Sequence, residues 1–232
     1  MTNSNNDSFE NLFSFVTKSI KERERIKKEY LKNEPEKYSI FRLNSDTLLL
    51  SIAKHLEEES KSSNETLTYQ YNLLYSFIRT YFVISDLIFK SDLIEAHILI
   101  RKQMETLTRL HELDKKPIAK LLKKTPNVLN LFGNAGKPLY PILSEIAHFS
   151  SIEVGNFISF KTAEGKIEPS LFPFYNKASL YCYEKHAFIS LYFMYWLKEF
   201  VKKTNIESYK LSDNESKFDE IVEMAFECKI VK

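Results

Sequence analysis

The chain has 232 residues, of which 44% are hydrophobic and 14% aromatic, and its 33 basic and 31 acidic residues leave a formal net charge of +2. This composition excludes an intrinsically disordered chain and predicts one compact domain with a sizeable core. The balanced charge excludes a global electrostatic field that would attract nucleic acid or anionic lipid, so any such binding must come from a local patch.

Cysteine usage and apolar runs indicate the expected location. Cys182 and Cys228 fall on different predicted helices and do not form a disulfide framework, as is typical of a reducing compartment. Residues 1–10 lack the basic start and the apolar stretch of a secretory signal. The most apolar run, 188–197, is about half as long as the roughly 20 residues that span a bilayer. We therefore expect a cytoplasmic protein with no membrane partner.

Residues that break helices divide the chain into three parts. All four glycines and six of the seven prolines lie between residues 117 and 173, so irregular structure is expected there and long helices on either side. The first helix is predicted to start near Ser8, after a disordered start over 1–7. The mixed-charge run 21–30 in its second half is predicted to face solvent.

Two further helices are predicted before residue 90. A break at Pro35 precedes the second helix, for which Ser45 or Asp46 is the predicted N-cap. A capping box at 62–65 opens the longest periodic stretch, which ends near Phe89.

The following segments are shorter. A helix over 92–114 is expected to fold back on its predecessor as an αα-hairpin, because the joint between them is short. A short lysine-rich helix (117–124), a loop (127–136), an apolar helix (139–151) and a small β-hairpin (157–172) are predicted next.

The C-terminal part is predicted to be helical again. An aromatic core helix covers 174–202, and a polar linker over 204–212 leads to the capping box Ser212-x-x-Glu215, which opens an amphipathic terminal helix. The predicted fold class is all-α. We expect a single domain over 1–232, built as a bundle of about seven to eight helices with a small β-hairpin near 157–172.

Two of these helices carry polar residues that could meet at one site. Arg101, Glu105 and Arg109 recur every four residues on one helix, while Ser144 and His148 lie one turn apart on another. Arginine binds phosphate-like anions, glutamate can orient the arginine or a base, and histidine exchanges protons near neutral pH. We therefore predict Glu105, Ser144 and His148 as catalytic residues and Arg101 and Arg109 as ligand-binding residues.

The same patterns have structural interpretations. Arg101 and Glu105 match an i, i+4 ion pair worth about 0.2–0.5 kcal/mol to a helix, and His148 matches a buried histidine hydrogen-bonded for structure. Ser144 lacks the glycine-flanked elbow of a nucleophilic serine. Glu145-x-x-His148 matches half of a di-iron motif, but no second copy occurs, so neither a metal site nor a cofactor is predicted.

A lysine-rich segment is a candidate nucleic-acid patch. It contains no acidic residue and could contact phosphates without reading sequence. Its alternative interpretation is an amphipathic surface helix that buries Ile118, Leu121 and Leu122. The basic residues of this patch are Lys115, Lys116, Lys120, Lys123 and Lys124.

The runs 100–110 and 139–150 together resemble a pattern in widespread bacterial proteins. The pattern is an Arg-x-x-x-Glu helix followed by Tyr-x-x-Leu-Ser-x-x-x-His, a small hairpin and a long helix, and it covers 92–197. These proteins are commonly grouped with the HEPN-like helical superfamily, which contains RNA-cleaving toxins, phage-defence proteins and non-catalytic relatives. The resemblance implies a helical bundle, frequently a homodimer, with a polar cluster at Arg101, Glu105, Tyr140, Ser144 and His148.

The chain departs from the ribonuclease motif of that superfamily, which places an arginine a few residues before the histidine. Pro141, Ile142 and Leu143 stand there instead. Two hypotheses follow. In the first, the cluster, with Tyr140 among its ligand-binding residues, binds or processes RNA or a nucleotide in a defence or stress role. In the second, the cluster is a structural brace in a non-enzymatic module that dimerises or binds a partner through apolar helix faces.

Overall fold

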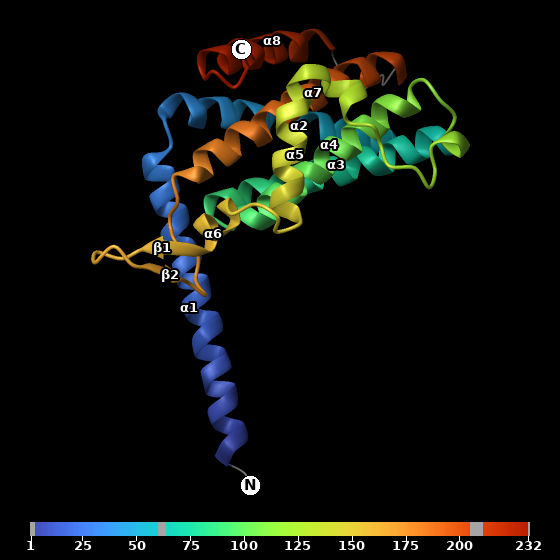
Figure 1. Cartoon of the computed structure of the whole chain (residues 1–232). Coiled ribbons are helices and arrows are strands. Elements are labelled where there is room, and N and C mark those ends of the chain that lie inside the picture. The colour runs from blue at the N-terminus through green and yellow to red at the C-terminus, as the bar shows by residue number, and fades with distance from the viewer. Residues whose placement is uncertain (1–2, 60–63, 205–210, 232) are drawn as a thin grey trace.

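The predicted all-α class with a small β-hairpin is confirmed by the computed structural model, which describes residues 3–59, 64–204 and 211–231 (Figure 1). The described helices are α1 (Asn3–Asn33), α2 (Glu36–Glu59), α3 (Glu65–Phe89), α4 (Leu93–Leu113), the 3₁₀ turn η1 (Ile118–Lys120), α5 (Leu129–Ala147), α6 (Glu153–Ile158), α7 (Ala178–Thr204) and α8 (Leu211–Glu227). The strands are β1 (Ser159–Lys161) and β2 (Ile167–Pro169).

Helices α3, α4 and α7 enclose the hydrophobic core. The αα-hairpin predicted for α3 and α4 is confirmed, because the chain reverses at Lys90 and the two helices pack along their length. Phe77 of α3 stacks on Phe193 of α7 with ring centroids 3.8 Å apart, and Met104 of α4 is fully buried beside them. Helix α5 packs on α4, which brings the two predicted polar segments together.

The solvent-facing part of α1 differs from the prediction. The charged run 21–30 contains Ile26 and Tyr30, which are both fully buried, and Tyr30 packs on Phe89 with centroids 4.9 Å apart. The apolar first half instead projects away from the body, and Phe13 is 74% exposed (Figure 1). The physical reason is that only the second half of α1 lies against α3, so two apolar residues in a charged run are enough to anchor it.

Two helix starts also differ from the prediction. Helix α2 begins directly after Pro35, so Ser45 and Asp46 lie in its interior, where Asp46 accepts a hydrogen bond from the Tyr81 hydroxyl (2.7 Å). The N-cap of α3 is Asn64, whose side chain accepts from the backbone N–H of Leu67 (3.1 Å). The Ser62 of the predicted capping box lies outside the described residues.

The glycine-rich middle is more helical than predicted. The prediction of a loop over 127–136 is wrong, because α5 starts at Leu129 and continues through a kink at Gly133, whose backbone has φ +51° and ψ −128°. The predicted 117–124 helix is reduced to the turn η1. Helix α5 ends at Ala147, so His148 becomes its C-cap residue.

The hairpin and the C-terminal elements follow the prediction more closely. Strands β1 and β2 pair antiparallel, with Phe160 opposite Glu168. Helix α7 covers most of the predicted core helix. Residues 205–210 of the predicted linker, and 1–2 of the predicted disordered start, lie outside the described residues, while α1 already begins at Asn3. Ser212 falls inside α8, one residue after its start.

Throughout the ranges given above, every helix is too short or too polar to cross a bilayer.

Candidate functional site

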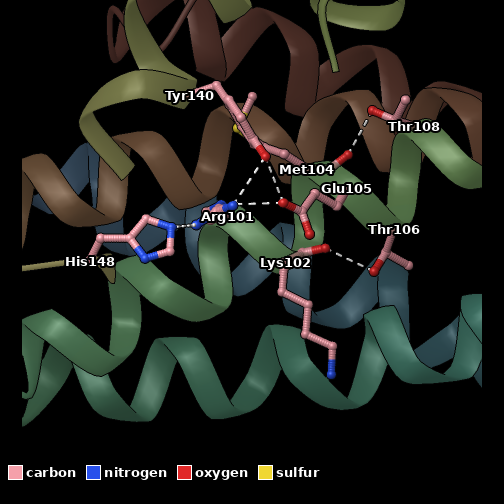
Figure 2. A network of polar contacts seen from close by, with 8 residues as sticks. All are labelled: Arg101, Lys102, Met104, Glu105, Thr106, Thr108, Tyr140 and His148. Carbon is pink, nitrogen blue, oxygen red and sulfur yellow. Dashed lines mark hydrogen bonds and ion pairs between the residues drawn. The ribbon is translucent and has the colours of Figure 1, made fainter. Parts of the chain in front are cut away.

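Helices α4 and α5 bring four of the predicted residues into one network (Figure 2). Arg101 and Glu105 lie one turn apart on α4, so their side chains share a face. Tyr140 lies on α5, and His148 ends the same helix. These four residues form the Arg101 cluster.

Arg101 lies at the centre of this cluster. Its Nε donates to Glu105 Oε1 (3.2 Å), and its Nη2 donates to the Tyr140 hydroxyl (3.3 Å). The Tyr140 hydroxyl in turn donates to the same Glu105 oxygen (2.7 Å). The guanidinium carbon lies 5.3 Å from the centroid of the Tyr140 ring, within cation–π range. Glu105 and Tyr140 therefore fix the guanidinium from two sides.

The remaining contact of the guanidinium is with His148. Arg101 Nη1 lies 3.1 Å from His148 Nε2. Because arginine can only donate, this contact is a hydrogen bond only when Nε2 is the acceptor, which places the ring proton on Nδ1. A proton added at Nε2 would break this contact, because both nitrogens would then be donors.

The cluster lies at the edge of the protein. The Arg101 and Glu105 side chains are 22% and 28% exposed, and His148 is exposed. Burial lowers the pKa of Arg101, but the Tyr140 and Glu105 contacts outweigh it and raise that pKa above its ordinary value. Burial, followed by the hydrogen bond to Glu105, raises the pKa of Tyr140. Arg101 thus stays charged and Tyr140 stays protonated at neutral pH.

Ser144 is not brought into the cluster. Its backbone carbonyl accepts the N–H of His148 (3.0 Å), which closes the last turn of α5. Among the residues that the structure describes, no hydrogen bond joins the Ser144 hydroxyl to Arg101, Glu105 or Tyr140. The geometry therefore gives the predicted nucleophile no activating base.

Arg109 is an anchor for a loop and not part of the cluster. Its guanidinium donates to the backbone carbonyls of Leu121 and Lys124, and its Nε lies 3.4 Å from Glu112 Oε2. The side chain is only 9% exposed. Each of its three guanidinium nitrogens therefore has a protein partner, and the predicted ligand-binding role for Arg109 stays a prediction.

The five lysines of the predicted patch are all exposed but do not share a helix face. Lys123 and Lys124 line an open cavity of about 300 Å³ on α3 and α4. Lys115 and Lys116 line another, of about 320 Å³, beside His111. Burial, together with the nearby Lys115 charge, lowers the pKa of His111. Lys120 lines neither cavity.

One residue of this region was missed at the sequence level. Lys102 and Glu105 both line the cavity that Lys123 and Lys124 line. Lys102 lies on the face of α4 beside the stripe that carries Arg101 and Glu105. The run of three basic or polar residues at 101–103 could have indicated Lys102. Residues spaced by four share one helix face, so a pattern of that spacing leaves out Lys102, which directly follows Arg101.

Over the described ranges, no group of three or more His, Cys, Asp or Glu side chains could hold a metal ion. Glu145, the other half of the di-iron pattern, is exposed.

Comparison with known proteins gives no family assignment. No protein-family model, curated protein or solved structure matches the chain. Function must therefore be argued from the geometry and chemistry of the site itself.

Proposed function

We propose that the Arg101 cluster binds a phosphate group of RNA or of a nucleotide. The observation that carries this proposal is the arrangement around Arg101: Glu105 and Tyr140 hold the guanidinium through Nε and Nη2, while Nη1 contacts the exposed His148. A guanidinium held at a fixed angle loses little freedom on binding and recognises phosphate oxygens through paired hydrogen bonds.

In this proposal His148 is the residue that exchanges a proton. A phosphate oxygen that enters between Arg101 and His148 would accept from Arg101 Nη1, so His148 Nε2 could take up a proton and become a second donor. Glu105 and Tyr140 are positioning residues, because Glu105 Oε1 and the Tyr140 hydroxyl are hydrogen-bonded to Arg101 and to each other. Processing of the bound ligand would use His148 as its acid or base.

The HEPN-like resemblance stays a prediction. It favours RNA, and a defence or stress role, over a free nucleotide. RNA and a free nucleotide share the phosphate group. One titration that includes both ligands therefore tests phosphate binding and shows which of the two is preferred.

The test is a titration of wild type and variants with inorganic phosphate, a nucleoside monophosphate and a short 5′-phosphorylated RNA. We expect Arg101→Ala to weaken binding of the preferred ligand by about tenfold or more, since a charge-assisted hydrogen bond contributes about 1.5–3 kcal/mol. Arg101→Lys should restore only part of this, because it keeps the charge without the fork. His148→Ala should weaken binding as well, because it removes the second donor to the phosphate oxygen.

Arg25→Ala is the matched control, because Arg25 is an exposed arginine with two carboxylate partners, Glu22 and Glu29. It should bind like wild type. If wild type binds none of the three ligands and Arg101→Ala only lowers the melting temperature, the cluster is a structural brace and the proposal is wrong.

We propose a second function of a different class, homodimerisation through α1, which a specific feature of that helix favours. Phe9, Phe13, Val16 and Ile20 are 71%, 74%, 45% and 58% exposed and follow the four-three-four spacing of a coiled-coil seam. The opposite side of α1 is already used, since Phe15 packs on Phe172 with centroids 5.1 Å apart.

A second copy of the chain fits this seam. In an antiparallel pair related by a two-fold axis, Phe13 of each copy would face Val16 of the other, so the seam is complementary to itself. Four large side chains from each copy, at roughly 100–200 Å² apiece, would bury on the order of 1,000 Å² in total, which reaches the lower limit for a specific interface.

The oligomeric state tests this function directly. Wild type should have twice the 27.3 kDa chain mass at micromolar concentration in light scattering, and Phe13→Glu should have the chain mass. Leu43→Glu is the control, because Leu43 is an apolar residue of α2 that is 55% exposed and lies outside the seam. A monomeric wild type, or a Phe13→Glu variant that stays dimeric, would contradict the proposal.

A further inference from the structure

A groove on the outer face of α3 and α4 lies directly beside the Arg101 cluster. Its volume is about 300 Å³, and its walls include Tyr69 of α3, Lys102 and Thr106 of α4, and the loop that carries Lys123 and Lys124. Glu105 lines the same groove while it holds Arg101 on the other side. The groove and the cluster therefore share one residue.

The groove carries excess positive charge. Lys102, Lys123 and Lys124 are exposed, and within the described part of the chain none of their ammonium groups forms an ion pair. The two other charged groups are already neutralised by partners, Arg109 by Glu112 and Glu105 by Arg101. Figure 2 shows Lys102 on the side of α4 that carries Thr106, pointing away from Tyr140. Among the described residues, three unpaired lysines thus outnumber the one carboxylate of the groove, Glu105, which is paired with Arg101.

The backbone of the loop is strained at a lysine. Lys123 has φ +62°, a left-handed conformation that glycine adopts far more readily than a residue with a Cβ. Arg109 holds the turn by donating to the carbonyls of Leu121 and Lys124 on either side of it. Strained residues persist where neighbours fix them, and they concentrate at binding sites. A lysine at this position has a rationale if its side chain is needed in the groove.

From these observations we infer that the groove is a second phosphate subsite, and that the ligand of the Arg101 cluster carries two or more linked phosphates. This inference rests on the phosphate-binding function proposed above. The Arg101 cluster holds one phosphate through the guanidinium, and Lys102, Lys123 and Lys124 hold the next as point charges. Tyr69 offers an aromatic face beside them. Both a nucleoside triphosphate and an oligonucleotide supply such a chain of phosphates.

The test compares inorganic phosphate with tripolyphosphate, a nucleoside triphosphate and a short oligonucleotide at fixed ionic strength. Wild type should bind tripolyphosphate at least tenfold more tightly than phosphate. Lys123→Gly should lose about fivefold to tenfold in tripolyphosphate affinity and nothing in phosphate affinity, because one charged contact is removed from the second subsite only. Its melting temperature should be equal to or higher than that of wild type, because glycine relieves the left-handed strain. The organic ligands then show which source of linked phosphates is preferred.

Lys120→Gly is the matched control, because Lys120 belongs to the same segment but does not line the groove. It should bind tripolyphosphate like wild type. Equal wild-type affinity for phosphate and tripolyphosphate, or wild-type tripolyphosphate binding by Lys123→Gly, would overturn this inference and leave the proposed function standing. Failure of wild type to bind any of these anions would overturn both.

Discussion

Lowering the pH from 6.5 to 4 is expected to lower the free energy of unfolding by about 5 kcal/mol, because two buried histidines are neutral in the folded protein. His97 is 1% exposed, and burial, together with the Lys185 ammonium 3.1 Å from its Nε2, lowers its pKa to about 4. His186 is fully buried, and burial lowers its pKa to about 3. Both side chains must gain a proton in a site that disfavours the charge.

The direction follows from where each state takes up protons. In the unfolded chain both histidines bind a proton near pH 6.5, whereas in the folded protein His97 does so near pH 4 and His186 near pH 3. Between these values the unfolded state holds more protons, so stability falls as the pH falls. Each histidine contributes about 1.4 kcal/mol per pH unit, or about 2.7 kcal/mol per unit for the pair between pH 6 and 4. Two pH units then remove about 5 kcal/mol, which is at least a third of the roughly 5–15 kcal/mol that stabilises a typical domain.

Urea titrations at several pH values between 7 and 4.5 would measure this slope. His186→Gln should halve it, because glutamine does not titrate and one buried histidine remains. An unchanged slope in that variant would show that other groups control the acid sensitivity. A flat stability profile in wild type would show that the histidines are hydrated or protonated in the native protein.

The sequence predicted well the elements whose hydrophobic spacing is regular and long. The helix predicted at 92–114 is α4, and the spacing that put Arg101 and Glu105 on one face is the spacing that the structure uses. The contact between Arg101 of this pair and His148 depends on how α5 packs against α4, because His148 lies at the end of α5. Spacing identified both stripes and suggested that they could meet at one site, but it could not specify which side chains would touch.

The differences between prediction and structure share a physical cause. The local sequence pattern does not specify which distant residue a side chain will contact. Tyr30 looks like part of a solvated charged run until α3 packs against it through Phe89. Gly136 looks like a loop residue, yet a Cβ there would lie 2.7 Å from the Cβ of Phe132, so the glycine allows a close approach within α5. The same four-residue spacing put Arg109 in the candidate site, although its partners are backbone carbonyls 12 and 15 residues away.

Arg109→Ala is expected to lower the free energy of unfolding by about 3–5 kcal/mol, the cost of leaving a buried charge without its partner. The Arg109 and Glu112 side chains are 9% and 14% exposed, so Glu112 would keep a poorly solvated charge. The carbonyls of Leu121 and Lys124 would also lose their charged donors. Chemical denaturation measures the change. Arg25→Ala, which breaks only exposed ion pairs, should change it by less than about 1 kcal/mol.

The loss of stability in Arg109→Ala should be larger than the loss of the positive charge alone explains. Arg109→Lys keeps the positive charge for Glu112, but its single nitrogen cannot occupy both positions from which Nη1 and Nη2 donate to the carbonyls of Leu121 and Lys124. We therefore expect Arg109→Lys to recover less than half of the lost stability and to bind tripolyphosphate as weakly as Lys123→Gly, because the left-handed turn at Lys123 loses the donors that hold it. A lysine variant with wild-type stability would show that Arg109 acts as a charge for Glu112 and not as the anchor of the groove.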